Sequence, residues 1–171
     1  LPAFLWARSP AGRDTIERAG RTAARFGLQW LMVLPLAASS LWLAPISHNI
    51  NGLVGDWNGL VSYGALLLYG AFVFGSTDLL NALRRQRLLS LAIGIAAYAV
   101  LYVGFFQGTV RPVISPEARP GFALLSAINT MAWLFATLGF AHRYLTARPA
   151  FLAEATEAVY PFYILHQTVT V

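Results

Sequence analysis

The stretch Leu88–Val110, LLSLAIGIAAYAVLYVGFFQGTV, contains no charged side chain in 23 residues. An α-helix needs about 20 apolar residues to cross a bilayer, so this stretch is long enough for one span. Three other stretches share its character and are also predicted to span: 26–44, 57–77 and 121–141. We therefore expect an all-α, polytopic transmembrane helix bundle that forms a single integral-membrane domain over 1–171.

A fifth apolar run occupies residues 158–171 and has 14 residues, fewer than a span requires. We interpret this run as a fifth span that is cut short. The apolar residues 1–7 read in the same way as the end of an earlier helix. The sequence thus predicts four complete spans, a truncated fifth, and a chain that is the C-terminal part of a longer protein.

The composition restricts the kinds of chemistry that this chain can carry out. It is 57% hydrophobic and 11% charged, whereas soluble domains have about 25% charged residues. There is no cysteine, which excludes disulfides, thiolate metal sites and cysteine nucleophiles, and we expect no metal site. The net charge of +5 comes from arginines between apolar runs. A membrane topology signal explains these arginines better than a nucleic-acid partner does.

The arginines also predict the orientation of the bundle. Segments 1–25, 78–87 and 142–157 fall on one side of the predicted spans and hold ten arginines, whereas 45–56 and 111–120 hold two. Cytoplasmic loops of membrane proteins carry an excess of Lys and Arg. We therefore expect the N-terminal side to be cytoplasmic, in a bacterial inner membrane with lipid as the surrounding partner.

The segments between the spans have predicted structures of their own. Residues 11–25 have helical charge spacing, with Glu17 and Arg21 as an i,i+4 pair, and form either a helix at the lipid headgroups or a solvated connector. Residues 78–87 are predicted to be a short polar loop. Within the spans, Pro35 is expected to kink the first helix.

Three small residues of the second span are expected to allow close approach of a neighbouring helix. They are Gly64, Gly70 and Gly75.

His166 is the most unusual side chain of the fifth run. It would lie roughly 12 Å into that span, near the middle of the bilayer. Tyr163 shares its helical face, and Tyr160 and Gln167 stand on an adjoining face. Ionisable residues at this depth normally face the bundle interior or a cavity. The stripe is therefore either a pocket wall that orients a polar substrate or transfers a proton, or a histidine satisfied by an interhelical hydrogen bond.

Two further groups of polar residues have alternative interpretations. His142 and Arg143, at the end of the fourth span, either bind an anionic phosphate or anchor the helix at the interface. The same alternatives apply to the arginines of the polar segment before the third span: Arg84, Arg85 and Arg87.

On the other side, several sugar-compatible groups surround the start of the second span: His48, Asn51, Asp56, Trp57 and Asn58. They either contact a glycan or serve local structure, with Asp56 as the N-cap of the helix.

Three stretches together resemble a known family. GFAHRYLTARPAFLAEATEAVYPFYILHQTVTV (139–171) is similar to the C-terminal region of the bacterial acyltransferase family 3 membrane proteins, particularly the glucan succinyltransferase branch. NGLVGDWNGLVSYGALLLYGAFVFG (51–75) and LPAFLWARSPAGR (1–13) also resemble segments of that branch.

The resemblance implies a membrane-bound O-acyltransferase. Such an enzyme would use acyl-CoA as donor and would transfer an acyl group, succinyl for instance, to a hydroxyl of a carbohydrate acceptor outside the cytoplasm. Its catalytic histidine would lie upstream of residue 1, so the missing N-terminal half would be an obligatory partner and the present chain alone would be inactive.

The residues that match the family's late motif are its site candidates. The resemblance implies pocket roles for His166, Tyr163, Tyr160 and Gln167, and contacts of Arg143 and His142 with the acyl-CoA phosphates. The competing hypothesis is a transporter or translocation module without acyl-transfer chemistry, since a histidine within the membrane and interrupted apolar helices also suit a permease.

Overall fold

The computed structural model describes residues 9–47, 55–106 and 115–145, and within these ranges the chain is α-helical without a β-strand. Four helical segments are long and apolar enough to cross a membrane: Leu28–Ile46, Trp57–Phe74, Thr77–Phe105 and Arg119–Tyr144. They confirm the all-α transmembrane bundle and its four predicted complete spans. The predicted truncated span at 158–171 lies outside the described residues.

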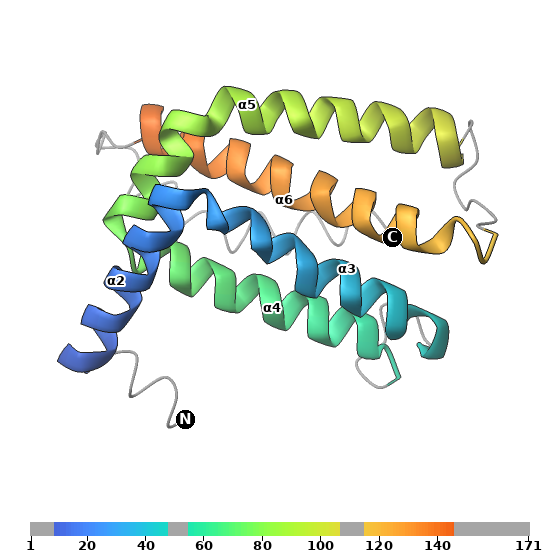
Figure 1. The fold of residues 1–171 in the computed structure, drawn as a ribbon, viewed down its shortest axis with the longest axis horizontal. Helices are drawn as coiled ribbons and strands as arrows, with labels where there is room; N and C mark the ends of the chain where they lie inside the picture. The colour runs from blue at the N-terminus through green and yellow to red at the C-terminus, as the bar shows by residue number, and fades with distance from the viewer. Residues whose placement is uncertain (1–8, 48–54, 107–114, 146–171) are drawn as a thin grey trace, which may run out of the picture.

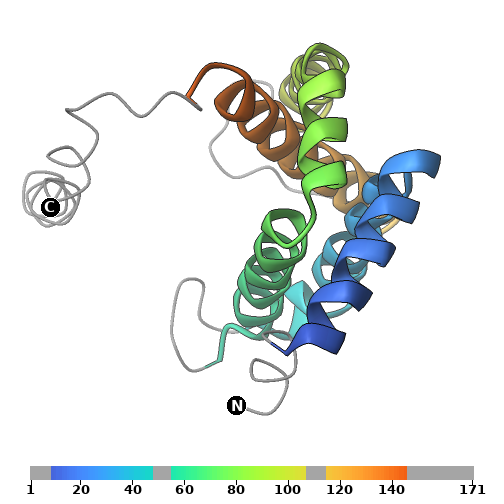
Figure 2. The same cartoon turned by 90° about the vertical axis from the view of Figure 1, so that its left-hand side faces the viewer.

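The spans lie side by side in the order α5, α6, α3, α4 (Figure 1). Helix α6 (Arg119–Tyr144) packs along α5 (Thr77–Leu101) on one side and α3 (Val33–Trp42) on the other. Helix α4 (Trp57–Phe74) packs against α3. Helix α2 (Pro10–Phe26) crosses one end of this layer, as the turned view shows (Figure 2).

The helix directions place the described arginines mainly at one end of the bundle. Eight of them are on α2, on the first turns of α5 or on the last turn of α6: Arg13, Arg18, Arg21, Arg25, Arg84, Arg85, Arg87 and Arg143. We call this the arginine-rich end. Among the described residues Arg119, the first residue of α6, is the arginine of the opposite end.

The first span is not one continuous α-helix. A 3₁₀ segment, η1 (Leu28–Met32), precedes α3, and a short 3₁₀ turn, η2 (Ala44–Ile46), follows it. Pro35 lies in the first turn of α3, next to the change from 3₁₀ to α geometry. The kink expected at Pro35 stays a prediction; the structure places Pro35 in the first turn of α3, where the missing N–H costs the helix little.

The polar loop predicted at 78–87 is wrong, because these residues form the first turns of α5. Ser76 caps this helix with its hydroxyl, and Asp78 lies in the first turn, where a negative charge favours the helix dipole. Leu79 and Leu83 are buried, at 0% and 1% exposure. The segment is therefore an amphipathic helix that continues into the span, which then ends in a π-helical turn, η3 (Tyr102–Phe106).

Helix α2 confirms the helix predicted over 11–25. Ser9 caps it, Pro10 is its first residue, and Gly27 ends it with φ of 69°, in the left-handed region that favours glycine. The predicted pair of Glu17 with Arg21 is wrong. Arg21 instead donates to Asp78 of α5 at 3.1 Å, because α2 lies across the start of that helix.

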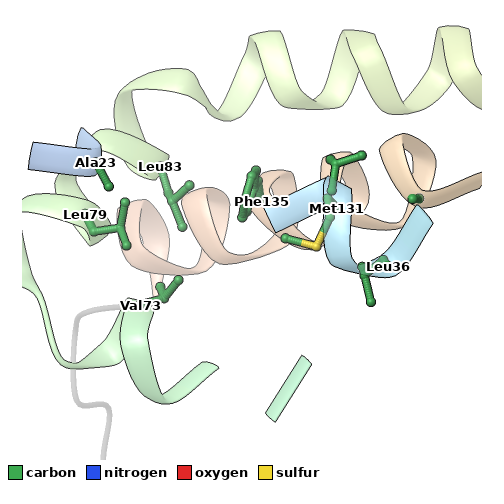
Figure 3. Packing of buried hydrophobic residues seen from close by; sticks show 9 residues of the cluster. Ala23, Leu36, Val73, Leu79, Leu83, Met131 and Phe135 are labelled. Atoms are coloured by element: carbon green, nitrogen blue, oxygen red, sulfur yellow. The ribbon is translucent and has the colours of Figure 1, made fainter. Parts of the chain in front are cut away.

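The core is formed mainly by α3, α5 and α6, and Ala23 of α2 and Val73 of α4 also belong to it (Figure 3). Phe135 and Met131 of α6 are completely buried; Phe135 lies between Leu83 of α5 and Met131, and Met131 lies towards Leu36 of α3 (Figure 3). Trp30 of η1 meets Phe135 edge to face, with ring centroids 5.2 Å apart. Van der Waals packing of this kind is the main force between helices in a bilayer.

Glycines let two helix pairs come close. A Cβ at Gly139 of α6 would lie 2.5 Å from the Leu83 carbonyl oxygen of α5, and one at Gly75 would lie 2.7 Å from Ile16 of α2. The close approach predicted at Gly75 is confirmed. Gly64 and Gly70 face open space within the described residues, so they allow no close approach there.

Candidate functional site

A polar cleft of about 480 Å³ opens between α3, α4 and α6, towards the end opposite the arginines. It is the candidate site of the described structure. Its apolar floor is formed by Leu36, Ala44, Leu66, Ala123 and Ala127. Its polar lining is formed by Ser40, Ser47, Asp56, Asn58, Ser62, Tyr63, Ser126 and Thr130. A bundle surface that otherwise faces lipid thus carries a concentrated group of hydroxyls.

The start of α4 is built by local hydrogen bonds around the cleft. Asp56 is the N-cap, and its carboxylate accepts from the Gly59 N–H at 2.8 Å. The Asn58 N–H donates to the Ser47 hydroxyl at 3.0 Å, and Ser47 in turn donates to the Leu43 carbonyl at 2.9 Å. These bonds satisfy donors that a helix N-terminus leaves free, and they hold α4 against the end of α3.

A second network connects α3 to α4 inside the cleft wall. The buried Ser39 hydroxyl donates to the Asn58 carboxamide oxygen at 2.9 Å and lies 2.8 Å from the Ser62 hydroxyl. A hydroxyl has one proton to donate, so Ser62 must be the donor to Ser39. The network fixes the orientation of the polar side chains on this wall.

Other hydroxyls of the cleft have hydrogen-bonding capacity to spare. The hydroxyls of Ser40, Ser126 and Tyr63 make no hydrogen bond to any described residue. Thr130 donates to the Ser126 carbonyl at 3.0 Å, which leaves its hydroxyl oxygen able to accept. These groups can therefore exchange bound water for the hydroxyls of a ligand.

A basic side chain stands beside the cleft. Arg119 lines a neighbouring hollow of about 310 Å³ that shares Ser40, Ala44 and Ala123 with the cleft. A guanidinium here can bind a carboxylate or phosphate of a molecule seated in the cleft.

The chemistry that this cleft offers is recognition of a neutral, hydroxyl-rich molecule with a nearby anionic group. No set of histidine, aspartate and glutamate residues that could hold a metal ion exists among the described residues. The carboxylate of Asp56 is engaged in capping α4. Among the described residues, those that line the cleft form no nucleophile–base pair.

All four pocket residues predicted from the sequence lie outside the described residues: Tyr160, Tyr163, His166 and Gln167. Two of the sugar-compatible residues, His48 and Asn51, also lie outside them. Within it, the N-cap predicted at Asp56 is confirmed. Asn58 lines the cleft, whereas Trp57 is 55% exposed outside it.

His142 and Arg143 lie in the last turn of α6, far from the cleft. Thr130, the cleft residue of α6 nearest to them, is 13 positions before Arg143, or roughly 20 Å of helix. The Arg143 guanidinium lies 5.9 Å from the ring centroid of Tyr144. The structure thus places these phosphate candidates away from the cleft, at the other end of α6.

Sequence reasoning missed Ser40, Ser62, Ser126 and Thr130, because single hydroxyls hardly change the hydropathy of a span. The available signal was the i,i+4 spacing of Ser126 and Thr130, which places two hydroxyls on one helical face.

Comparison of the chain with known protein families, with curated proteins and with solved structures finds no match.

Proposed function

We propose that this chain is part of a membrane-bound O-acyltransferase and that the polar cleft binds its carbohydrate acceptor. The observation that supports the proposal is the position of the cleft, opposite the arginine-rich end. With the arginine-rich end in the cytoplasm, as in other membrane proteins, the cleft opens on the far side of a bacterial inner membrane. An extracytoplasmic carbohydrate would reach it from there.

The cleft suits such an acceptor chemically. Sugar hydroxyls are both donors and acceptors, and they match serine, threonine and asparagine side chains. The exposed ring of Tyr63 adds an aromatic surface at the edge of the cleft. Arg119 would pair with an anionic group near the bound sugar, such as the free carboxylate of a succinyl group.

The chemical step and its donor rest on the sequence resemblance. The expected base is a histidine upstream of residue 1, His166 and its neighbours are the pocket candidates, and Arg143 with His142 are the candidates for the acyl-CoA phosphates. The base would remove the proton of the acceptor hydroxyl, whose oxygen attacks the thioester carbonyl and releases the CoA thiol.

The test is acyl transfer by the full-length protein that contains this chain. Membranes receive labelled succinyl-CoA and a periplasmic glucan, and both labelled glucan and free CoA thiol are measured. Ser126→Phe, which fills the cleft, is expected to abolish labelling of the glucan. Leu124→Phe is the matched control, because Leu124 is exposed on the same helix but does not line the cleft. It should retain transfer.

His166→Ala at equal expression is expected to lose transfer as well. Full transfer by Ser126→Phe would contradict the cleft as the acceptor site. Absence of transfer by the parent protein with several acyl donors, together with uptake of a polar solute, would favour the transporter hypothesis instead.

A further inference from the structure

An apolar groove runs along the outer face of α6 at the arginine-rich end. Its volume is about 420 Å³. Leu91 of α5 borders it, and α6 contributes Trp133, Ala136, Thr137, Phe140, Ala141 and Tyr144, with Leu145 following the helix. The groove is separate from the polar cleft and shares no residue with it. The proposed function makes no use of it.

The length of the groove corresponds to one leaflet of a bilayer. Trp133 and Tyr144 border it and are 11 residues apart, or roughly 16 Å along the helix axis. Half of a hydrocarbon core about 30 Å thick is about 15 Å. The groove therefore extends from the interface, at Tyr144, to the depth where the acyl chains of that leaflet end.

Two guanidinium groups stand at the interfacial end of the groove. The Arg143 guanidinium lies 5.9 Å from the Tyr144 ring centroid, and that of Arg87 lies 5.8 Å from the Phe140 ring centroid. The Phe140 and Tyr144 rings are stacked, with centroids 6.2 Å apart. The two aromatic rings thus hold both cations at the same end of the groove.

Neither cation has an anionic partner among the residues that the structure describes. The ion pair among the described residues is that of Arg21 with Asp78, and neither Arg87 nor Arg143 has a carboxylate neighbour there. Arg87 donates one N–H to the Arg84 carbonyl at 2.8 Å, and its buried Nε has no hydrogen-bond partner. An anion at this position would neutralise the guanidiniums and would accept the remaining N–H donors.

We propose that the groove binds one anionic glycerophospholipid of the leaflet at the arginine-rich end. One acyl chain lies along α6 in the groove, and the phosphate lies against Arg87 and Arg143. The chemistry of the groove selects this occupant, because its apolar length fits an acyl chain and its cationic end fits a phosphate headgroup. The inference does not require the proposed acyl transfer. It assigns Arg143 to the lipid phosphate in place of the acyl-CoA phosphates, so the two assignments of this residue exclude each other.

The test measures lipid retention by the purified protein. An equimolar mixture of phosphatidylglycerol and phosphatidylcholine with identical acyl chains is added in neutral detergent, and the bound lipids are counted by native mass spectrometry. The wild type should retain more phosphatidylglycerol than phosphatidylcholine. The double variant Arg87→Gln/Arg143→Gln should lower this preference roughly thirtyfold, since each arginine near a lipid headgroup contributes about 1 kcal/mol.

The matched control removes two charges from the same end but away from the groove. Arg13→Gln/Arg18→Gln on α2 should keep the preference for phosphatidylglycerol. An equal loss in this control would assign the preference to the general charge of that end and would overturn the proposal. Arg143→Gln alone should reduce the preference for phosphatidylglycerol several-fold. Because Arg143 is exposed, this single variant is used if the double variant does not fold.

Three measurements test the occupant itself. Thr137→Trp fills the groove and should release the bound phospholipid, whereas Leu124→Trp, elsewhere on α6, should not.

Release of phosphatidylglycerol by free coenzyme A, which has phosphates but no acyl chain, would assign the cations to the acyl donor and overturn the lipid site. The chain has no cysteine, so a disulfide between two Thr137→Cys copies in the membrane would show a second copy there and would also overturn it.

Discussion

The Arg21 guanidinium donates to the Asp78 carboxylate at 3.1 Å and so joins α2 to the first turn of α5. The two residues are 57 positions apart in sequence. The bond shows how the amphipathic arginine-rich helix is held across the end of the bundle. A second contact also joins these helices. Gly20 of α2 packs directly against Ser76, the N-cap of α5.

The ion pair is expected to contribute little to stability, because its side chains are 67% and 44% exposed. Exposed pairs contribute about 0.2–1 kcal/mol. A double-mutant cycle with Arg21→Gln and Asp78→Asn, measured by unfolding in detergent, should give a coupling energy in that range that decreases with salt. Glu17→Gln is the control and should show no coupling to Arg21.

Gly139→Ala is expected to destabilise the α5–α6 pair. Its Cβ would lie 2.5 Å from the Leu83 carbonyl oxygen and 2.9 Å from the Arg87 Cβ, so the helices must separate. Such overpacking costs about 1–3 kcal/mol, which would lower the midpoint of thermal unfolding. Gly70→Ala, at a site with open space, should leave the midpoint unchanged or slightly higher. Equal midpoints for the two variants would contradict the tight α5–α6 contact.

A half-buried hydrogen bond joins Gln29 of η1 to Gln86 of α5. Gln29 is fully buried, and its Nε2 donates to the Gln86 carboxamide oxygen at 2.8 Å. Gln86→Leu leaves this donor unpaired in the core, and we expect a loss of about 1–3 kcal/mol in the free energy of unfolding.

The double variant Gln29→Leu/Gln86→Leu removes both polar partners and should recover most of that loss. Chemical unfolding of both variants in the same detergent checks the prediction. If Gln86→Leu were as stable as the wild type, the bond would not be formed in the protein.

Glu117, just before α6, should titrate below its usual value of 4.5. Hydrogen bonds from its own backbone N–H and from the Ser115 hydroxyl stabilise the carboxylate and lower its pKa. Because the folded-state pKa is lowered, the stabilisation is complete above the usual value and is lost as the pH falls through the lowered pKa. Ser115→Ala should raise the Glu117 pKa towards 4.5, which carboxyl NMR titration can follow.

The polar segment at 78–87 explains one failure of sequence-based prediction. Its charges suggested a loop, yet Leu79 and Leu83 lie on one helical face and are buried in the core that α5 shares with α2 and α6. A charged segment next to a span can be either a loop or an amphipathic helix, depending on whether another helix covers its apolar face. That partner comes from residues about 50 positions away and leaves no trace in the local pattern.

The sequence by itself determined the four described spans and the uneven distribution of arginines. Both are local properties, because a bilayer requires a long apolar run wherever the chain crosses it and charges must lie between such runs. Only the tertiary structure decided the polar cleft and the lipid-sized groove. The hydroxyls of Ser40, Ser62 and Ser126 come from three different helices, and they become one site only because close packing places those helices side by side.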